Sequence, residues 1–265
     1  MAFTLSGRVA LVSGGGTGIG RAIALELARA GAAVAICGRR SDPLAATIAE
    51  VRSEGGMGID CAGDVTVEAA RRAVVAKTEG ELGPIDILIA NAALTDPTES
   101  AWEGASAAEW LRQLDVGAHS GYALAQLVGP GMCARRHGRI VFIGSVLGSL
   151  GIDPALYRTA AAPAGVSDIP YHAAKGAVLA TSRALACALG RHGVTVNVIS
   201  PGMVATEAMA GLVPDDVRSR LEERTPLGRM AAPSEIAGAA LFLASEAGSF
   251  VTGHDLVVDG GWSAW

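Results

Sequence analysis

Aromatic residues are scarce in this chain of 265 residues, at 4% of the total. A core of useful size therefore has to be aliphatic, and a hydrophobic fraction of 50% is enough to supply one. The chain also lacks any composition shift, internal repeat or low-complexity segment that would mark a boundary. We therefore expect a single domain that spans residues 1–265.

The chain has fewer basic residues than acidic ones, 21 against 26, and its net charge is −5. A mildly acidic chain without a basic stripe argues against nucleic acid as a partner. The sequence also has no apolar run long enough to span a bilayer, and its N-terminus does not follow the pattern of a secretory signal. We expect a cytoplasmic protein that has no membrane partner.

Cysteine and histidine both lack the spacing of a metal site. The four cysteines form no C-x-x-C pair and the five histidines show no ligand spacing, so we expect no metal and free thiols in a reducing compartment. A serine hydrolase is also unsupported, because the sequence has no Gly-x-Ser-x-Gly. The residues concerned are Cys37, Cys61, Cys133, Cys187, His119, His137, His172, His192 and His254.

Short apolar runs alternate along the chain with segments of helical spacing. The runs show no period-two alternation, which is typical of strands buried on both faces of a parallel sheet. We therefore expect an α/β fold, a doubly wound and mostly parallel seven-stranded sheet with helices on both faces. The expected strands are 8–13, 33–37, 57–61, 85–90, 139–144, 194–199 and 256–259, and the expected helices are 21–29, 44–52, 67–82, 109–136, 171–189 and 233–243. Glycines within 109–136 predict a bend or break in that helix.

A glycine-rich turn, residues 13–20, joins the first expected strand to the first expected helix. Gly14 would permit the tight turn, Gly18 would let the backbone approach a pyrophosphate, and Gly20 would allow the helix to pack closely on the strand. The free N–H groups of the helix N-terminus attract such an anion. The turn therefore predicts a dinucleotide site.

Tyr171 and Lys175 lie four residues apart in an expected helix, and so on one face of it. An ammonium group close to a phenol stabilises the phenolate and would lower the pKa of Tyr171, so that it could exchange a proton near neutral pH. The same spacing also arises in exposed helix pairs that have no chemistry. The pattern alone leaves both interpretations open.

The glycine spacing, the Tyr-x-x-x-Lys pair and the chain length together resemble the short-chain dehydrogenase/reductase family, over nearly the whole sequence. The resemblance implies a Rossmann-fold, NAD(P)-dependent oxidoreductase. It further implies that Ser145, which follows strand 139–144, stabilises charge on the substrate oxygen, that Tyr171 is the acid or base, and that Lys175 assists Tyr171.

The resemblance also implies a set of residues that bind the cofactor. Asn91 is as well suited to stabilising the sheet as to touching the nucleotide, whereas Asp64 and Val65 match the family's adenine contact. The full set is Gly14, Thr17, Gly18, Ile19, Gly20, Arg39, Asp64, Val65, Asn91, Tyr171, Lys175, Pro201, Gly202, Val204 and Thr206.

The end of the second expected strand bears on the choice of nucleotide. Relatives that prefer NAD carry an acid where this chain has Gly38, and Arg39 follows it. A missing carboxylate and a guanidinium able to bind phosphate favour NADP(H), with NAD(H) possible if Arg39 is merely solvated.

The chain departs from the family pattern at two places. Gly117 stands where many relatives carry an asparagine that holds a water of a proton relay. The interval between Ser145 and Tyr171 is also unusually long, and its extra residues include Asp153, Tyr157 and Arg158. We expect 149–169 to form a substrate-pocket loop and 205–230 a lid, since long loops after strand ends are often functional.

The sequence thus favours a carbonyl reductase, an NADP(H)-dependent enzyme that interconverts a ketone and a secondary alcohol. An NAD-dependent alcohol dehydrogenase of the polyol or sugar-acid type is an alternative, and a nucleotide-binding sensor without turnover is another. The resemblance also implies a homotetramer or a dimer. The partner expected from these interpretations is a small-molecule carbonyl or alcohol.

Overall fold

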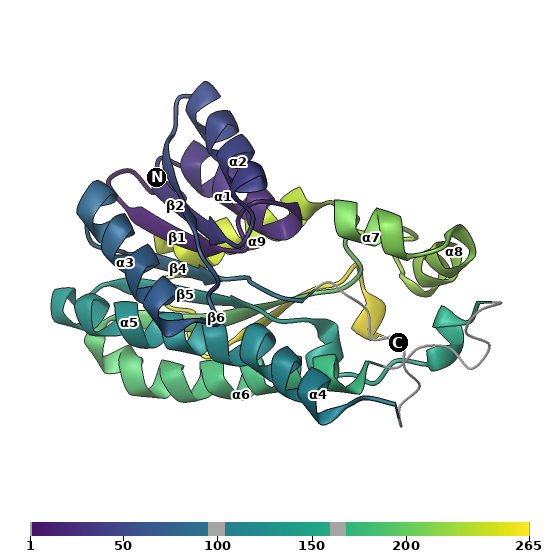
Figure 1. The fold of residues 1–265 in the computed structure, drawn as a ribbon. Helices are drawn as coiled ribbons and strands as arrows, with labels where there is room; N and C mark the ends of the chain where they lie inside the picture. The colour runs from purple at the N-terminus through teal and green to yellow at the C-terminus, as the bar shows by residue number, and fades with distance from the viewer. Residues whose placement is uncertain (1, 95–103, 160–167, 265) are drawn as a thin grey trace.

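A seven-stranded sheet forms the centre of the molecule (Figure 1), and every neighbouring pair of strands in it is parallel. The computed structural model describes residues 2–94, 104–159 and 168–264. The strand order is β3-β2-β1-β4-β5-β6-β7, which confirms the expected doubly wound sheet. The strands are β1 (Val9–Ser13), β2 (Ala33–Gly38), β3 (Met57–Ala62), β4 (Ile87–Ala90), β5 (Gly138–Ile143), β6 (Val194–Pro201) and β7 (Asp255–Val258).

Helices cover both faces of the sheet, and each face has its own aliphatic core. Alternate residues of β1 point to opposite faces, so that Ala10 and Val12 join one core while Val9 and Leu11 join the other. This is why the apolar runs show no alternation. One face carries α1 (Gly18–Arg29), α2 (Ser41–Ser53) and α9 (Pro233–Ala244), and the other carries α3 (Glu68–Leu82), α5 (Ser120–Arg135) and α6 (Ile169–Leu189).

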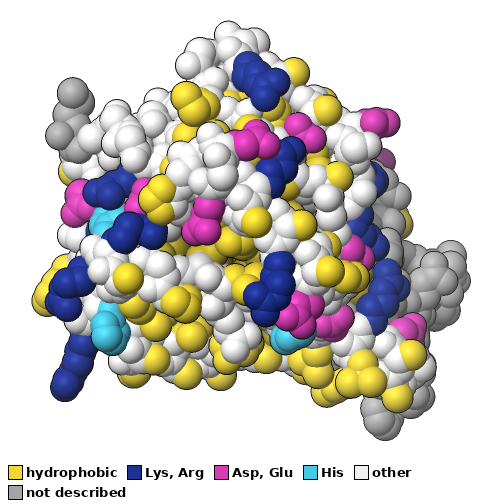
Figure 2. All heavy atoms as spheres, turned by 60° about the vertical axis from the view of Figure 1, so that its left-hand side comes forward, with side chains coloured by type: hydrophobic (Ala, Val, Ile, Leu, Met, Phe, Trp, Pro, Cys, Tyr) yellow, Lys and Arg dark blue, Asp and Glu magenta, His cyan; other side chains and the backbone are white. Residues whose placement is uncertain are grey.

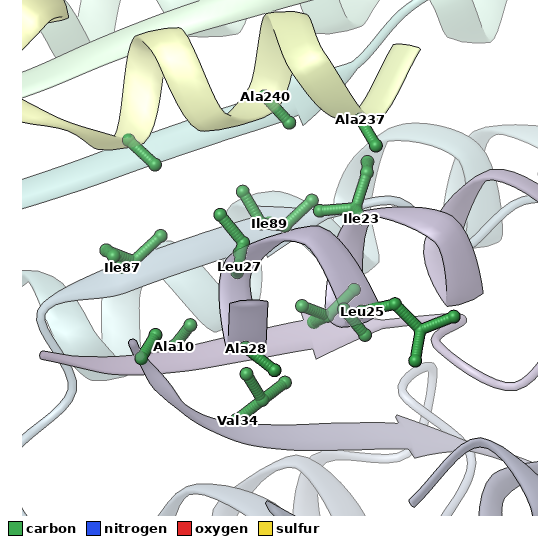
Figure 3. Packing of buried hydrophobic residues seen from close by; sticks show 14 of the residues in the cluster. Ala10, Ile23, Leu25, Leu27, Ala28, Val34, Ile87, Ile89, Ala237 and Ala240 are labelled. Carbon is green, nitrogen blue, oxygen red and sulfur yellow. The ribbon is translucent and has the colours of Figure 1, made fainter. Parts of the chain in front are cut away.

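Close packing of α1 against α9 shows how a core poor in aromatics is filled. Ile23 and Leu27 of α1 lie opposite Ala237 and Ala240 of α9 in Figure 3, and all four side chains are buried. The alanines let the helix axes approach, and the larger side chains fill the space above the sheet.

The expected helix 109–136 is divided into three pieces. It consists of α4 (Ala107–Leu114), a π-helical turn (Asp115–His119) and α5, so the α-helix is interrupted at a turn that contains Gly117, in line with the expected bend or break. The amide of Ser120 bonds the carbonyl of Asp115, five residues back, and this leaves the Val116 carbonyl without its usual amide. The Ser120 hydroxyl donates to that carbonyl at 2.8 Å.

The segment 205–230, expected to be a loop, contains two helices, α7 (Glu207–Leu212) and α8 (Asp215–Arg224). Its ends are joined by a bridge between Val204 and Ala231. The helices were hidden because α8 buries only Val217 and Leu221, one turn apart, in an otherwise charged sequence. Figure 1 shows α7 and α8 beyond the edge of the sheet. In the segment 149–169, residues 160–167 lie outside the described part.

Basic and acidic side chains are interspersed on the face shown in Figure 2, and apolar side chains are frequent along its lower edge. That edge is the side on which α5 and α6 lie in Figure 1. No helix in the described part of the chain combines the length and the apolar character that crossing a bilayer requires.

Candidate active site

The residues singled out from the sequence gather at one edge of the sheet. Because all strands are parallel, their carboxyl ends meet there, which is where ligands bind in folds of this type. The glycine turn follows β1, Arg39 follows β2, Asp64 follows β3, Asn91 follows β4 and Ser145 follows β5. Pro201 is the last residue of β6.

The glycine turn has a backbone that side chains would obstruct. Gly14 and Gly18 have φ angles of +66° and +53°. A Cβ on Gly20 would lie 2.1 Å from the Gly14 carbonyl oxygen, so the start of α1 can pack against the turn only with glycine there. Thr17 precedes α1, and the helix then begins with Gly18 and Ile19. The residues present therefore fit a dinucleotide pyrophosphate at this helix N-terminus.

Asn91 braces the turn against the neighbouring strand. Its side-chain amide donates to the carbonyls of Ser13 at 3.0 Å and Gly14 at 3.2 Å. The Ser13 hydroxyl in turn accepts from the amides of Asn91 and Ala92. The sequence left open whether Asn91 stabilises the sheet or touches the nucleotide. Stabilising the sheet already uses both N–H donors of its side-chain amide.

Arg39 and Asp64 lie at the ends of neighbouring strands. The Arg39 side chain is exposed and forms no ion pair with any described residue. Hydrogen bonds from the amide and hydroxyl of Thr66, joined by the charge of Arg39, hold the pKa of Asp64 below its ordinary value. Val65, the next residue, is buried.

Ser145 is placed by a short turn that packs on α6. It begins a single 3₁₀ turn (Val146–Gly148), and its hydroxyl accepts from the amide of Leu147 at 3.2 Å. A Cβ on Gly148 would lie 2.8 Å from the Lys175 carbonyl, so the turn can approach this part of α6 only with glycine at that position. Sequence reasoning did not identify the role of Gly148, although a glycine three residues after Ser145 is a signal that could have pointed to it.

Tyr171 and Lys175 are positioned by the start of α6. The Asp168 carboxylate caps the helix by accepting from the Tyr171 amide at 3.1 Å, and Pro170 occupies the first turn. Lys175 is buried, with its Nζ 5.6 Å from the centroid of the Tyr171 ring. The Nζ donates to the Ile143 carbonyl at 2.8 Å. The structure thus brings Ser145, Tyr171 and Lys175 together.

The ionisation of this group differs from the sequence expectation. Burial raises the pKa of Tyr171, a hydrogen bond with Ser145 opposes the rise, and the charge of Asp168 adds to it. Burial also lowers the pKa of Lys175 to about 8. The expected lowering of the Tyr171 pKa by Lys175 was therefore wrong for this structure, because desolvation outweighs the other effects and the ammonium is bonded to the Ile143 carbonyl.

The segment after β6 lies against the glycine turn. Thr206 caps α7, and its methyl carbon lies 3.2 Å from where a Cβ of Gly18 would be. Gly202 packs so closely on Asp259 that a Cβ there would lie 2.8 Å from the Asp259 Cα. Val204 forms the bridge at the base of the α7–α8 segment.

The polar side chains around Gly117 are bonded to each other or to the backbone. Asp115 and His119 are exposed and bond each other at 2.7 Å, and the Ser120 hydroxyl is bonded to the Val116 carbonyl. Gly117 itself lies against α6, where a Cβ on it would be 3.1 Å from the Ala174 Cβ.

A group of packed side chains lies beyond Ser145, and the sequence predicted only part of it. A third apolar cluster joins Val146 to Val217, Leu221 and Trp262, with Tyr157 and Met203 packed against it. Arg220 of α8 donates to the carbonyls of Leu156 and Arg158, and so ties α8 to the turn that holds Tyr157. Arg220 was missed because its partners are backbone atoms about sixty residues away.

Known proteins share both this sequence and this fold. Residues 14–263 match the family model described as enoyl-(acyl carrier protein) reductase. Gluconate 5-dehydrogenase of Gluconobacter oxydans (strain 621H) is 38% identical over 260 residues, which cover 98% of this chain and 96% of that protein. The 3-oxoacyl-[acyl-carrier-protein] reductase of Escherichia coli (strain K12) is 35% identical, with 96% and 97% covered. The chain belongs to the short-chain dehydrogenase/reductase family.

Solved structures agree with that assignment. A gluconate 5-dehydrogenase from Burkholderia cenocepacia, in complex with NADP and tartrate, superimposes with a TM-score of 0.89 at 34% identity and covers 100% of this chain and 98% of its own. As a family member, this protein is an NAD(P)-dependent oxidoreductase that acts on CH–OH or C=O groups. In the described part of the chain, no three His, Cys, Asp or Glu side chains form a group that could hold a metal ion.

Proposed function

We propose that this protein interconverts a ketone and a secondary alcohol with NADP(H), with Tyr171 as the acid or base. The observation that carries the proposal is the meeting of Ser145, Tyr171 and Lys175 at the sheet edge that also holds the glycine turn. A nucleotide pyrophosphate on that turn would extend along the same edge toward these three side chains.

Each of the three side chains has a distinct role. The Ser145 hydroxyl, already bonded to Tyr171, binds the substrate oxygen and stabilises charge on it. Tyr171 gives its proton to that oxygen in reduction and takes one in oxidation. Lys175, whose Nζ is bonded to the Ile143 carbonyl, fixes the turn of α6 that carries Tyr171. The nicotinamide, when bound, supplies or accepts the hydride.

The remaining predicted residues hold the nucleotide. The turn from Gly14 to Gly20 binds the pyrophosphate, and Asp64 and Val65 bind the adenine. Tyr171 and Lys175 would also contact the nicotinamide side, together with Pro201, Gly202, Val204 and Thr206. Support comes from Thr206, which lies against Gly18.

Preference for NADP(H) rests on Arg39. Its guanidinium is exposed beside the strand end where an acid would exclude a 2′-phosphate. Two similar gluconate 5-dehydrogenase structures are also described as bound to NADP. The alternative of an NAD-dependent enzyme has support from the structure of a 7α-hydroxysteroid dehydrogenase with NADH, which is 30% identical.

The substrate is proposed to lie between the segments 149–169 and 205–230, as pocket loop and lid of a single catalytic domain. The contacts of Arg220 with the turn around Tyr157 support this, because they close one side of the edge beside Ser145. The similarity to gluconate 5-dehydrogenase makes a hydroxylated acid the first substrate to test.

We also propose a cytoplasmic homo-oligomer, a tetramer or a dimer. Its free cysteines suit a reducing compartment. A depression between α5 and α6, lined by Tyr122, Ala125, Gln126, Gly129, Pro130, Cys133, Leu185 and Leu189, supports contact with a second copy.

The test is consumption of NADPH and NADH over a panel of ketones, read together with the reverse reaction on gluconate. Tyr171→Phe is expected to lower kcat by about 10²–10⁴-fold, the usual contribution of a general acid, without weakening NADPH binding by more than a few fold. Arg39→Asp is expected to raise the Kd for NADPH and reverse the cofactor preference. Wild-type rates in Tyr171→Phe would remove this residue from the mechanism, and binding without turnover of any substrate would favour the non-catalytic sensor.

A further inference from the structure

The Tyr157 hydroxyl has an unusually poor partner for a polar group at this place. Tyr157 ends the short turn η3 (Pro154–Tyr157) and is partly buried among apolar side chains. In the described part of the chain, its oxygen is bonded only to the Met203 sulfur, at 3.9 Å. A thioether is a weak acceptor, so most of the hydrogen-bonding capacity of this hydroxyl is unused.

Several contacts hold the turn that carries this side chain in place. The Asp153 carboxylate caps the turn by accepting from the Ala155 amide at 2.9 Å. Arg220 donates to the carbonyl before Tyr157, that of Leu156, at 3.0 Å, and to the carbonyl after it, that of Arg158, at 2.5 Å. Because the backbone on both sides of Tyr157 is fixed by α8, binding of a ligand by this residue orders little additional chain and costs little entropy.

Tyr157 lies near the reacting groups, because it packs against the cluster that contains Val146, the residue after Ser145. Burial, together with the electrostatic influence of Tyr171, raises the pKa of Tyr157 to about 12. Tyr157 therefore keeps its proton at neutral pH and can act there as a donor. Its partner Met203 comes two residues after the end of β6, at the edge where Ser145 also lies.

We propose that Tyr157 determines specificity by donating a hydrogen bond to a second oxygen of the substrate, on the carbon next to the one that reacts. The inference deepens the proposed function and rests on it. Ser145 and Tyr171 bind the oxygen that reacts, and Tyr157, packed against the cluster of Val146 next to Ser145, meets the neighbouring one. The substrates favoured are vicinal diols and their α-hydroxyketones, and a substrate without the second oxygen gains nothing from this donor.

The chain has three tyrosines, which supply a matched set of Tyr→Phe variants that each lose one oxygen. The assay compares oxidation of cis-1,2-cyclohexanediol and cyclohexanol with NADP⁺, two alcohols that differ by one hydroxyl. Tyr157→Phe is expected to lower kcat/KM for the diol about tenfold, the value of one neutral hydrogen bond, mainly through KM, and to leave cyclohexanol unchanged.

The other two variants are the controls. Tyr122→Phe, in the depression between α5 and α6 and away from the carboxyl ends of the strands, keeps the ring and loses only the bond to Gln126, and is expected to change the rate on neither alcohol. Tyr171→Phe is expected to lose activity on both alcohols. NADPH affinity, followed by its fluorescence, is expected to stay at the wild-type value in Tyr157→Phe, which shows that the fold is intact.

Three outcomes would overturn the inference: a wild type that does not prefer the diol, an unchanged diol-to-cyclohexanol ratio in Tyr157→Phe, or equal losses on both alcohols. Equal losses would mean that Tyr157 only supports the fold. A wild type that binds NADPH yet oxidises neither alcohol and reduces no ketone would instead contradict the proposed function itself, and the inference with it.

Discussion

Lys175 carries a charge that the fold buries beside a carbonyl. Its Nζ donates to Ile143, and its pKa falls to about 8 because burial disfavours the charged form. Below that pH the lysine is protonated in both the native and the unfolded protein, and the native state bears the full cost of the buried charge. As the pH rises above about 8, the native lysine loses its proton while the unfolded one retains it up to its ordinary value of 10.5. Unfolding then takes up a proton, so stability rises with pH.

The Lys175→Met variant tests whether the buried lysine causes this rise of stability with pH. The free energy of unfolding of the wild type is expected to increase, relative to the variant, between about pH 7 and about pH 10, by at most about 1.4 kcal/mol per pH unit. Urea unfolding at each pH measures it. The other lysine of the sequence, Lys77, is a matched control, because it also donates to a carbonyl at 2.8 Å but from an exposed position. Curves for wild type and Lys175→Met that stay parallel would contradict the expectation.

Sequence reasoning at the residue scale could name candidates where a local pattern carries the chemistry. Ser145, Tyr171 and Lys175 could be named because strand ends and a helical spacing place them. The pKa of Tyr171 could not be predicted, since it depends on burial by parts of the chain far away. The position of Tyr157 was equally hidden, because Arg220 fixes it through backbone atoms.

At the scale of elements, the π-turn between α4 and α5 shows how a distant contact shapes a helix. Its glycines predicted a bend, but its position reflects the approach of Gly117 to Ala174, which is fully buried and precedes Lys175. The helices α7 and α8 were missed for the opposite reason, since their polar sequence shows little helical periodicity.

Gly117→Ala tests the importance of that approach. Gly80, in α3, has open space where a Cβ would lie, with no atom within 4 Å, so Gly80→Ala is expected to stabilise the protein by about 0.5–1 kcal/mol through helix propensity. Gly117→Ala is expected to gain none of this, because its Cβ would lie 3.1 Å from that of Ala174. Displacement of the Lys175 turn is expected to lower kcat as well, by up to about tenfold.

Urea unfolding and the ketone assay measure both effects. Equal stabilisation by the two alanines, with wild-type kcat in Gly117→Ala, would show that α6 yields freely and that the close approach has no consequence for the site.

For the whole molecule, the alternation of strands and helices was enough to predict a parallel sheet, because parallel strands need crossover helices. The alternation also placed the site, since strand ends meet at one edge. The alternation of strands and helices does not predict which surface would contact another copy of the chain. The helix packing offers a candidate for that surface, since α5 and α6 leave a depression between them and apolar side chains gather along the same side of the molecule (Figure 2).

Gly129→Arg tests whether a second copy occupies this depression. Gly129 lines it, and no atom lies within 4 Å of the position that a Cβ would take there, so the variant chain can fold with the arginine directed outward. Light scattering on a sizing column is expected to show a dimer or tetramer for the wild type and a smaller species for Gly129→Arg, because a long charged side chain prevents close packing of two copies. Gly80→Arg, equally open but on α3, is expected to keep the wild-type mass. A wild-type monomer, or a Gly129→Arg variant with unchanged mass, would exclude this face as the interface.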